Sequence, residues 1–413
     1  LIKELKSPDD GDEEFLLHQF NNKILPGVDE TSKLKANFLY DIVNKKQYSP
    51  LIDQYDAINI LGTMKGGYNI EALVNLLDTD FGLHSAENLK NNILIFDYYY
   101  SIEEKYKKGN SFAKTLIESW ANAEWFTKNN KLEKKITLTC FKVDGEINTD
   151  DLSPAQDAWS RPDIPLHAES MLKVPRDGIQ PDIPYEKGPI ETINWLKQRK
   201  FPVAFVGDIV GTGSSRKSAT NSILWHFGDK IPYVPNKKTG GFCIGGKIAP
   251  IFHDTMEDSG ALPIEMNVED IKMGQTIDIY PYDGICKDYN TNNLISKFEY
   301  KSPTILDSVR AGGRINLIIG KSLTRKAQTT LNKFNTSYFI PNSANSTNSA
   351  NSANSTNSAN SANSPNSAKN GYTLAQKIVG KACGVEGINP HTYCEPIITS
   401  VGSQDTTGPM TRD

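Results

Sequence analysis

The sequence has few cysteines, no clustered metal-ligand residues and no long apolar run. It contains five cysteines among 413 residues, and no two of them stand in a C-x2-C spacing. Neither a disulfide framework nor a structural zinc site is therefore indicated. The six histidines are scattered, without an H-E-x-x-H or H-x3-H pairing, so we assign no metal to residues of this chain. No apolar run approaches the ~18 residues of a membrane span, which argues against a membrane partner.

The sequence also lacks a marked excess of either charge. It has 45 Lys+Arg against 49 Asp+Glu, a net charge of −4, and no block of five or more like charges. This balance gives no support for RNA binding. The first residues, Leu1–Leu5, lack the charged-then-apolar pattern of a secretion signal, so we expect a cytoplasmic protein. They also lack a starting Met, and we expect a fragment or a processed product.

Residues 1–130 carry the apolar spacing of successive amphipathic helices. One stripe follows residues 29–31, and another begins after Ser111. Ser49-Pro50 is expected to open a further helix, with Pro at its first position. Short turns between such helices predict an all-α domain of stacked helix pairs. The two stripes comprise Leu34, Phe38, Leu39, Ile42 and Val43, then Phe112, Ala113, Leu116, Ile117, Trp120 and Ala123.

Residues 135–330 change to strands that alternate with helices. Residues 135–141 alternate with period two and are rich in β-formers. Helical stretches are expected at Pro189–Arg199 and Ser215–His226. This alternation predicts an α/β domain of about 200 residues. Further strands are expected at Val203–Val206, Cys243-Ile244, Thr276–Tyr280, Phe298–Tyr300 and Ile315–Ile319.

A low-complexity tract separates this domain from the last part of the chain. Residues 342–368 are nine triplets of Asn-Ser-Ala, Asn-Ser-Thr or Asn-Ser-Pro. Such a tract lacks the apolar surface that would offset its ordering entropy, so we interpret 336–370 as a disordered linker. Residues 371–413 begin with a short helix, at 371–380, and are expected to be the truncated start of a third α/β domain.

The clearest chemical signal is a glycine turn between a strand and a helix, in the segment Val203–Lys217. The apolar strand is followed by Gly211-Thr212-Gly213 and then by Ser214-Ser215-Arg216. A helix start offers free N–H groups and a partial positive charge, and glycines allow close approach. The spacing fits neither G-x-G-x-x-G nor G-x4-G-K-[ST]. Two interpretations remain: an ordinary capped turn, or a site for a carboxylate or phosphate.

Two other polar segments carry candidate ligands. Asn148–Ala155 and the following Trp159–Asp163 form a Pro-flanked loop after a strand, with Asp150 and Arg161. An ordinary Asp/Ser turn with a surface Arg would show the same residue pattern. The third segment, Ser400–Gly408, contains Gln404, Asp405 and Thr406 and could equally be a capped helix start.

These segments, taken together, resemble the bacterial-type aconitase B family (aconitate hydratase B, 2-methylisocitrate dehydratase). The resemblance covers nearly all of the chain except the Asn-Ser tract. The residues that carry it are Glu14–Leu17, Leu61–Ile70, Asn148–Ala155, Trp159–His167, Gly211–Asn221, Gly245–Phe252, Arg310–Ile315 and Gly402–Asp413.

The resemblance implies a HEAT-like helical domain, then a mobile swivel domain, then domains that hold a [4Fe-4S] cluster. It implies a hydro-lyase of the tricarboxylic acid cycle, which interconverts citrate, cis-aconitate and isocitrate, with 2-methylisocitrate as a further substrate. One cluster iron would act as a Lewis acid. A homodimer through the helical domain is also implied, and in some members RNA contact.

The resemblance also assigns roles to residues. Ser214 resembles the catalytic base, and Ser215 and Arg216 resemble ligands of the substrate carboxylates. Arg161 resembles a second carboxylate clamp. Asp150 resembles an active-site acid that orients its neighbours. In the next domain, the family's substrate-contacting segment corresponds by resemblance to Gln404, Asp405 and Thr406.

The cysteines depart from the family pattern. Cys383 and Cys394 do not form the C-x2-C pair that family members use for the cluster, so its Cys ligands are absent here. We therefore expect this fragment alone to be inactive. One alternative is the small subunit of an isopropylmalate-isomerase-type enzyme, although the helical region and the Gln404 segment argue against it. The other is a non-catalytic protein- or RNA-binding module built on the helical domain.

Overall fold

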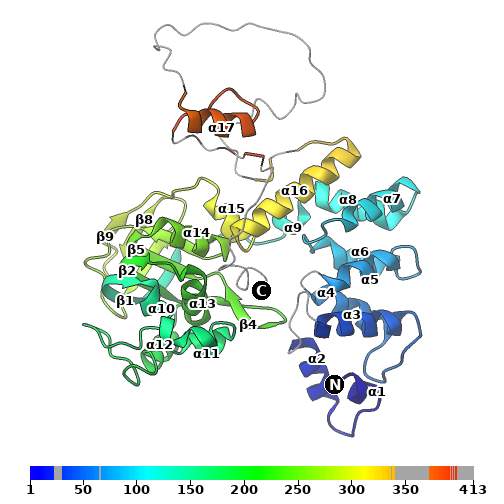
Figure 1. Cartoon of the computed structure of the whole chain (residues 1–413), viewed down its shortest axis with the longest axis horizontal. Coiled ribbons are helices and arrows are strands. Elements are labelled where there is room, and N and C mark those ends of the chain that lie inside the picture. The colour runs from blue at the N-terminus through cyan, green and yellow to red at the C-terminus, as the bar shows by residue number, and fades with distance from the viewer. Residues whose placement is uncertain are drawn as a thin grey trace, which may run out of the picture. The chain divides into compact units, whose positions relative to one another are not determined.

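The computed structural model describes residues 1–22, 30–64, 67–335, 337–339 and 372–390, with positions 392, 394, 396 and 397. The chain divides into two compact units, residues 1–301 with 305–338 and residues 302–304 with 339–413. The first unit holds a helical region followed by an α/β region (Figure 1), as the sequence predicts. The repeat tract at 342–368 lies outside the described residues.

Successive amphipathic helices build the N-terminal region. Their apolar faces form one continuous core, in which Phe20, Leu39, Leu61 and Trp120 are fully or almost fully buried. The predicted helix start at Ser49-Pro50 is wrong, because Asp53 caps the helix instead and accepts the Asp56 N–H at 2.7 Å. The helices are α1 (Ile2–Lys6), α2 (Glu13–Asn22), α3 (Glu30–Val43), α4 (Gln54–Thr63), α5 (Tyr68–Leu76), α6 (Gly82–Lys90), α7 (Tyr98–Lys107), α8 (Ser111–Ala121) and α9 (Glu124–Thr127).

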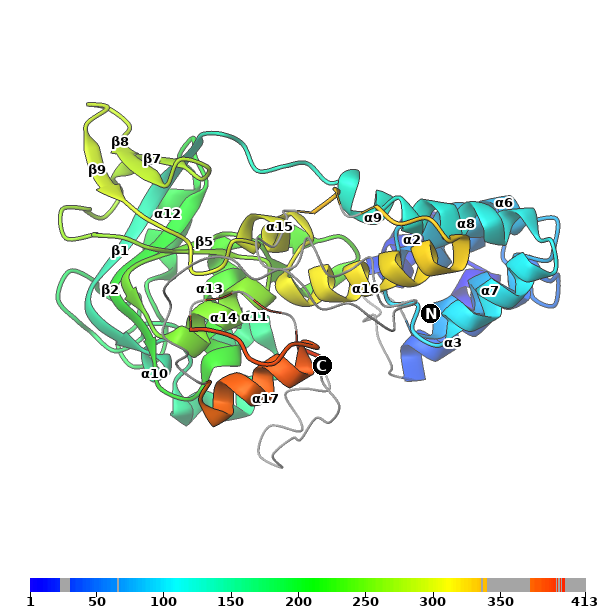
Figure 2. The same cartoon turned by 90° about the horizontal axis from the view of Figure 1, so that it is seen from above.

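A late helix completes the helical core. Helix α16 (Arg314–Leu331) follows the α/β region but packs beside α8 and α9 (Figure 2). Its Leu323 and Ala327 belong to the helical core, and its Thr324 Oγ1 accepts the Trp125 indole N–H at 2.9 Å. The strand predicted at Ile315–Ile319 is wrong, because these residues open an 18-residue helix. A short apolar run does not show its period, and the helical spacing is apparent only further along.

The α/β region is built on a seven-stranded mixed sheet with the order β6-β5-β2-β1-β7-β8-β9. Strands β1, β2, β5 and β6 are parallel neighbours, and β7, β8 and β9 continue the sheet antiparallel from β1. A separate hairpin joins β3 to β4. The strands are β1 (Ile136–Asn148), β2 (Val203–Thr212), β3 (Asp229–Ile231), β4 (Val234–Thr239), β5 (Phe242–Ile248), β6 (Leu262–Glu265), β7 (Thr276–Tyr280), β8 (Ile285–Asp288) and β9 (Leu294–Lys297).

Both faces of the parallel part are buried. Phe141 and Phe205 face one core, shared with α12, α13 and α14, whereas Cys140 and Ala204 face a second core. Burial on both sides accounts for the unbroken apolar run at Val203–Val206. The connecting helices are α10 (Thr149–Leu152), the 3-10 turn η1 (Ala155–Ser160), α11 (Ile164–Ala168), α12 (Ile190–Lys197), α13 (Arg216–Phe227), α14 (Pro250–Asp258) and α15 (Ile305–Arg310).

The remaining predicted elements have mixed outcomes. Strands at Val203–Val206, Cys243-Ile244 and Thr276–Tyr280 are confirmed, and so are the helices at 189–199 and 215–226. The strand at Phe298–Tyr300 is wrong: Phe298 is buried in the second core but lies outside any strand. In the second unit, α17 (Leu374–Ala382) confirms the predicted short helix, capped by Thr373. Within the described ranges, no helix combines the length and the apolar character that crossing a bilayer requires.

Gly320 allows the close packing between α16 and α9. A Cβ added there would lie 2.2 Å from the Trp125 ring. In an unobstructed helix, Gly→Ala would stabilise by about 1 kcal/mol. At this contact we expect Gly320→Ala to destabilise the fold by about 1–3 kcal/mol, because the ring must move. Urea unfolding followed by tryptophan fluorescence measures the change. Ser322→Ala, at an exposed position of the same helix, is the control; equal stability of the two variants would contradict the packing argument.

His226 is a buried histidine that we expect to make the α/β region sensitive to acid. Its Nε2–H donates to the Ala168 carbonyl at 2.8 Å and ties α13 to the end of α11. Burial lowers the pKa of this imidazole to about 4. The unfolded pKa is about 6.5, so between these values the unfolded chain binds a proton that the folded chain does not. This contribution to stability is complete above pH 6.5 and is lost as the pH falls toward 4.

We therefore expect His226→Gln to flatten the acid side of the stability profile, because its amide N–H can replace Nε2–H without titrating. The difference between parent and variant should change by on the order of 3 kcal/mol from pH 6.5 to pH 4. Urea unfolding at several pH values provides the measurement. Parallel pH profiles of the two proteins would rule out His226 as the source.

Candidate functional site

The candidate site lies where two neighbouring parallel strands end. Strand β1 ends at Asn148 and β2 ends at Thr212, and these two residues are paired in the sheet. Because parallel strands deliver their carboxyl ends to the same edge, the two predicted polar segments meet there. Loops fixed on such a rigid scaffold commonly carry function.

The first segment turns sharply into a short helix. The Asn148 side chain accepts the N–H groups of Asp150 and Asp151 at 2.7 and 2.9 Å, and the Asp151 carboxylate accepts the Asn148 N–H at 2.8 Å. This reciprocal cap fixes the start of α10. Asp150 is exposed on the first turn, while Thr149 is buried and faces the second segment.

Two glycines fold the second segment against the first. Gly211 and Gly213 have φ of +81° and +112°, a region that L side chains rarely adopt. A Cβ on Gly213 would lie 2.5 Å from the Thr149 hydroxyl oxygen. This close approach lets the Ser215 N–H donate to Thr149 Oγ1 at 3.2 Å. The glycine turn therefore brings the start of α13 onto the start of α10.

Arg161 joins the two segments from the side of β1. Its Nη2 donates to Ser215 Oγ at 3.1 Å, with a longer contact of 3.4 Å to the Ser153 carbonyl. Its Nε is buried and has no hydrogen-bond partner among the described residues. Ser214 is exposed and Arg216 is half-buried, directly before and after Ser215. Arg161 and Ser215 thus meet at one sheet edge, with Ser214 and Arg216 on either side of Ser215 in the chain, and a bidentate anion could be bound there.

A buried hydroxyl and imidazole network supports this arrangement. His167 lies between Ser153 Oγ and Ser160 Oγ, at 2.8 Å from each, and Ser153 Oγ donates to Ser218 Oγ at 2.9 Å. Burial, together with the charge of Arg161, lowers the pKa of His167. His167 is not among the candidate site residues that the sequence motifs indicate. The one feature of the sequence that pointed to it is that it lies in the same short segment as Arg161. Its hydrogen bonds to Ser153 and Ser160 form only when the chain folds, so the sequence alone does not reveal them.

A second network of polar groups lies at a β-bulge in β1, before the strand reaches its end at Asn148. The β1–β2 register shifts between Val143 and Glu146. The buried Lys142 ammonium lies 2.6 Å from Asp144 Oδ1 and 2.6 Å from Asp208 Oδ1. Burial alone would lower the pKa of Lys142, but these two bonds outweigh it and the net pKa is raised. Bulges of this kind commonly occur beside active sites, where they redirect a side chain.

The three buried cysteines of the α/β region do not fit an iron–sulfur cluster. Cys140, Cys243 and Cys286 are buried in the α/β region as free thiols, on three different strands. Burial raises the pKa of Cys243 and of Cys286 to about 12, and raises that of Cys140 as well. A cluster requires thiolates, which such apolar surroundings disfavour. The predicted contact residues Gln404, Asp405 and Thr406 lie outside the described residues.

The fold and the site define a helical domain joined to an α/β domain, with arginine and serine side chains at the carboxyl ends of two parallel strands. Two family descriptions match the chain: Aconitate hydratase 2 N-terminus over residues 138–351, and Aconitate B N-terminal domain over residues 1–126. The chain belongs to the aconitate hydratase B family. This confirms the resemblance drawn from the sequence.

Similar proteins align with this chain over its whole length. Aconitate hydratase B of Pseudomonas aeruginosa is 52% identical over 417 residues, which covers 100% of this chain and 46% of the relative. Aconitate hydratase B of Escherichia coli is 53% identical over 414 residues, with the same coverage. The Synechocystis protein is 47% identical and covers 100% of this chain and 44% of its own length. The chain therefore spans somewhat less than half the length of these relatives.

The network around His167 can be tested by stability alone. His167→Leu removes both ring nitrogens from buried hydroxyls, and we expect a loss of about 1–3 kcal/mol in the free energy of unfolding. Urea denaturation followed by circular dichroism measures it. His18→Leu, on the exposed side of α2, is the control and should change stability by less than about 0.5 kcal/mol. A His167→Leu protein as stable as the parent would show that the hydroxyls find other partners.

Proposed function

We propose that this chain forms part of an aconitate hydratase, a hydro-lyase that interconverts citrate, cis-aconitate and isocitrate, with 2-methylisocitrate as a second substrate. Family membership supports the reaction class. The observation that carries the proposal is the hydrogen bond from Arg161 to Ser215, which unites two separate polar segments at one sheet edge. A substrate with several carboxylates needs this kind of cationic and hydroxyl-bearing surface.

Ser214 is the proposed base that removes the carbon-bound proton. A serine hydroxyl is a weak base, and it acts only where cations and N–H donors stabilise its alkoxide. Ser214 directly precedes Ser215 and Arg216, and the start of the 12-residue α13 follows immediately. The partial positive charge of that helix start and the two guanidinium groups favour the ionised form.

The other residues have binding and orienting roles in this proposal. Arg161, Ser215 and Arg216 bind the substrate carboxylates, and exposed Asp150 orients the neighbouring polar groups. Gln404, Asp405 and Thr406 contribute further substrate contacts. A [4Fe-4S] cluster in the complete enzyme would take its ligands from residues other than the buried Cys140, Cys243 and Cys286, because these thiols do not suit it.

The domain roles follow the same family pattern. We assign the helical region to a HEAT-like domain and the α/β region to a swivel domain that presents Ser214 and Arg161 to the substrate. A homodimer through the helical domain stays a prediction. The alternative of a protein- or RNA-binding module is not supported by the comparisons.

Kinetics of the complete enzyme can separate the proposed role of Ser214 as the base from that of Arg161 as a ligand of the substrate carboxylate. We expect Ser214→Ala to lower kcat for citrate by about 10²–10⁴-fold, with KM little changed, because a proton-transfer group is lost. Arg161→Gln should raise KM at least about tenfold, with Arg161→Lys intermediate, because the planar fork is lost.

Arg325→Gln, at an exposed position of α16, is the matched control for the lost positive charge. Near-parental kcat for Ser214→Ala, with unchanged iron content, would remove Ser214 from the mechanism. An Arg161→Gln enzyme with unaltered KM would separate Arg161 from substrate binding and would leave only its structural bond to Ser215.

A further inference from the structure

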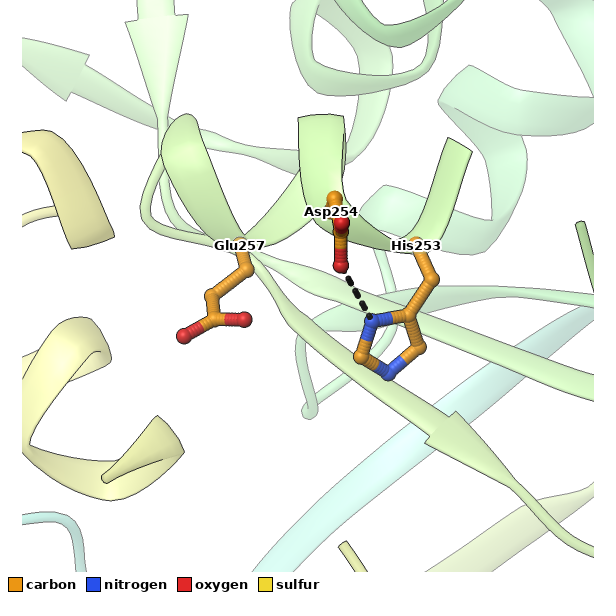
Figure 3. Close-up of side chains that lie close together, drawn as sticks. All are labelled: His253, Asp254 and Glu257. Carbon is orange, nitrogen blue, oxygen red and sulfur yellow. Dashed lines mark ion pairs between the residues drawn. The ribbon is translucent and has the colours of Figure 1, made fainter. Parts of the chain in front are cut away.

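A second cluster of chemically reactive side chains lies on α14, apart from the residues assigned to the hydratase site. His253, Asp254 and Glu257 each offer one ligand atom, and these atoms lie within 4.8 Å of one another (Figure 3). The spacing of four residues places His253 and Glu257 on the same face of the helix, one turn apart. His253 and Glu257 are 3% and 2% exposed, whereas the side chain of Asp254 is 54% exposed.

The imidazole of His253 has an unmet bonding requirement. Its Nδ1 is buried and has no hydrogen-bond partner within the part of the chain that the structure describes. The nearest acidic atom, Asp254 Oδ1, lies 3.8 Å away, which is too long for a hydrogen bond. Buried polar atoms in native proteins nearly always form a hydrogen bond, and a buried polar atom without one destabilises the fold. Nδ1 faces the Asp254 carboxylate across this 3.8 Å separation (Figure 3).

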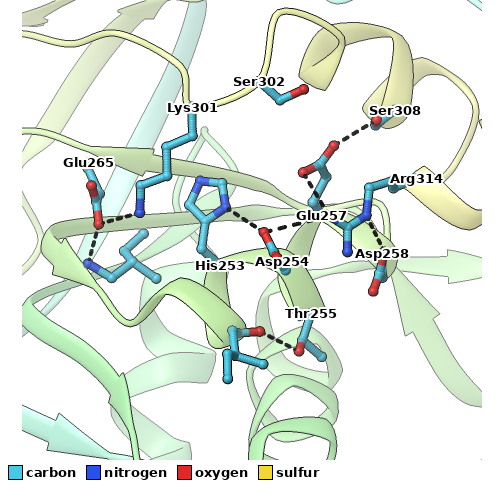
Figure 4. Close-up of polar contacts among 12 residues, drawn as sticks. His253, Asp254, Thr255, Glu257, Asp258, Glu265, Lys301, Ser302, Ser308 and Arg314 are labelled. Atoms are coloured by element: carbon cyan, nitrogen blue, oxygen red, sulfur yellow. Dashed lines mark hydrogen bonds and ion pairs between the residues drawn. The ribbon is translucent and has the colours of Figure 1, made fainter. Parts of the chain in front are cut away.

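The carboxylates also keep bonding capacity. Glu257 Oε1 accepts the Ser308 hydroxyl at 2.8 Å, while its Oε2 lies 4.0 Å from the Arg314 guanidinium (Figure 4). Arg314 makes its short bond to Asp258 instead, at 2.7 Å, and is 3.6 Å from Asp254. Arg314 thus contacts Asp254 and Glu257 only at 3.6 and 4.0 Å, and it forms a short ion pair with neither.

The local charge is unbalanced in favour of a divalent cation. Two cationic side chains border the cluster, and one of them, Lys301, is held by Glu265 at 2.9 Å. The carboxylates therefore exceed the cations by two charges. Glu257 is the buried carboxylate of this group, and a bound cation would compensate its charge, whereas Asp254, Asp258 and Glu265 are partly exposed to water. The four carboxylates are Asp254, Glu257, Asp258 and Glu265, and the two cations are Lys301 and Arg314.

We propose that His253, Asp254 and Glu257 bind one divalent transition-metal ion of the Zn²⁺ class. One imidazole and two carboxylates suit Zn²⁺, Co²⁺ or Ni²⁺, whereas Mg²⁺ and Ca²⁺ prefer ligand sets made of oxygen alone. The exposed side of Asp254 admits the ion and lets water complete its coordination. None of the three proposed ligands is a residue assigned to the hydratase site.

The test is titration of the full chain with Zn²⁺ by calorimetry and with Co²⁺ by absorption spectroscopy. We expect one ion per chain, a Co²⁺ spectrum without a thiolate charge-transfer band, and a higher Tm with Zn²⁺, because the ion binds the folded state. The parent chain and all variants carry Cys383→Ser and Cys394→Ser, which removes the two partly exposed thiols as competing ligands.

Three variants locate the ion. His253→Phe and Asp254→Asn should each lose the binding and the rise in Tm; Asp254 is exposed, so its variant does not depend on refilling a core. Arg314→Gln should bind Zn²⁺ about tenfold more tightly, because a positive charge about 4 Å from two ligands is removed. His84→Phe, at an exposed histidine, is the control and should bind as the parent does.

Absence of Zn²⁺ and Co²⁺ binding by the parent chain would overturn the proposal. Binding that survives in both His253→Phe and Asp254→Asn would also overturn it, because the ion would then be held elsewhere. Neither result bears on the proposed hydratase function, whose test uses Ser214 and Arg161.

Discussion

Parallel pairing between β1 and β2 is the constraint on which the candidate site depends. The pairing of Asn148 with Thr212 fixes two loop starts at the same edge, although 64 positions of chain separate them. Positive-φ glycines at 211 and 213 then let the second loop approach Thr149, and Arg161 closes the arrangement through Ser215. A register shift between these strands would separate the serine pair from the guanidinium.

Buried polar groups beneath the candidate site also stabilise it. His167 links the hydroxyls of Ser153 and Ser160, and Lys142 bridges Asp144 and Asp208 at the bulge. Such networks are favourable only when each member is satisfied, and they then rigidify the surface above them. A rigid edge holds the proposed base and carboxylate ligands in one geometry, which is what positioning contributes to catalysis.

Helix α16 links the two regions of the first unit in an unexpected way. It leaves the α/β region at Arg314, which bonds to Asp258 of α14, and its far half enters the helical core near Trp125. Arg314, the first residue of this helix, therefore borders the proposed metal cluster on α14. The chain returns to its first domain after completing its second, so sequence boundaries alone do not describe the packing.

Local sequence determined much of this protein: the amphipathic helices, the strands at 136–141 and 203–206, the glycine turn and the polar residues that mark a family. These features depend on near neighbours, through periodicity, capping and turn chemistry. The strands predicted at Ile315–Ile319 and Phe298–Tyr300 are wrong, because a short apolar run can be buried equally well in a strand, in a helix such as α16, or outside regular structure as Phe298 is. Only the tertiary structure decided that Arg161 meets Ser215, that His167 joins two serines and that α16 enters the helical core. Those contacts join residues far apart in the chain, and burial and sheet pairing decide them.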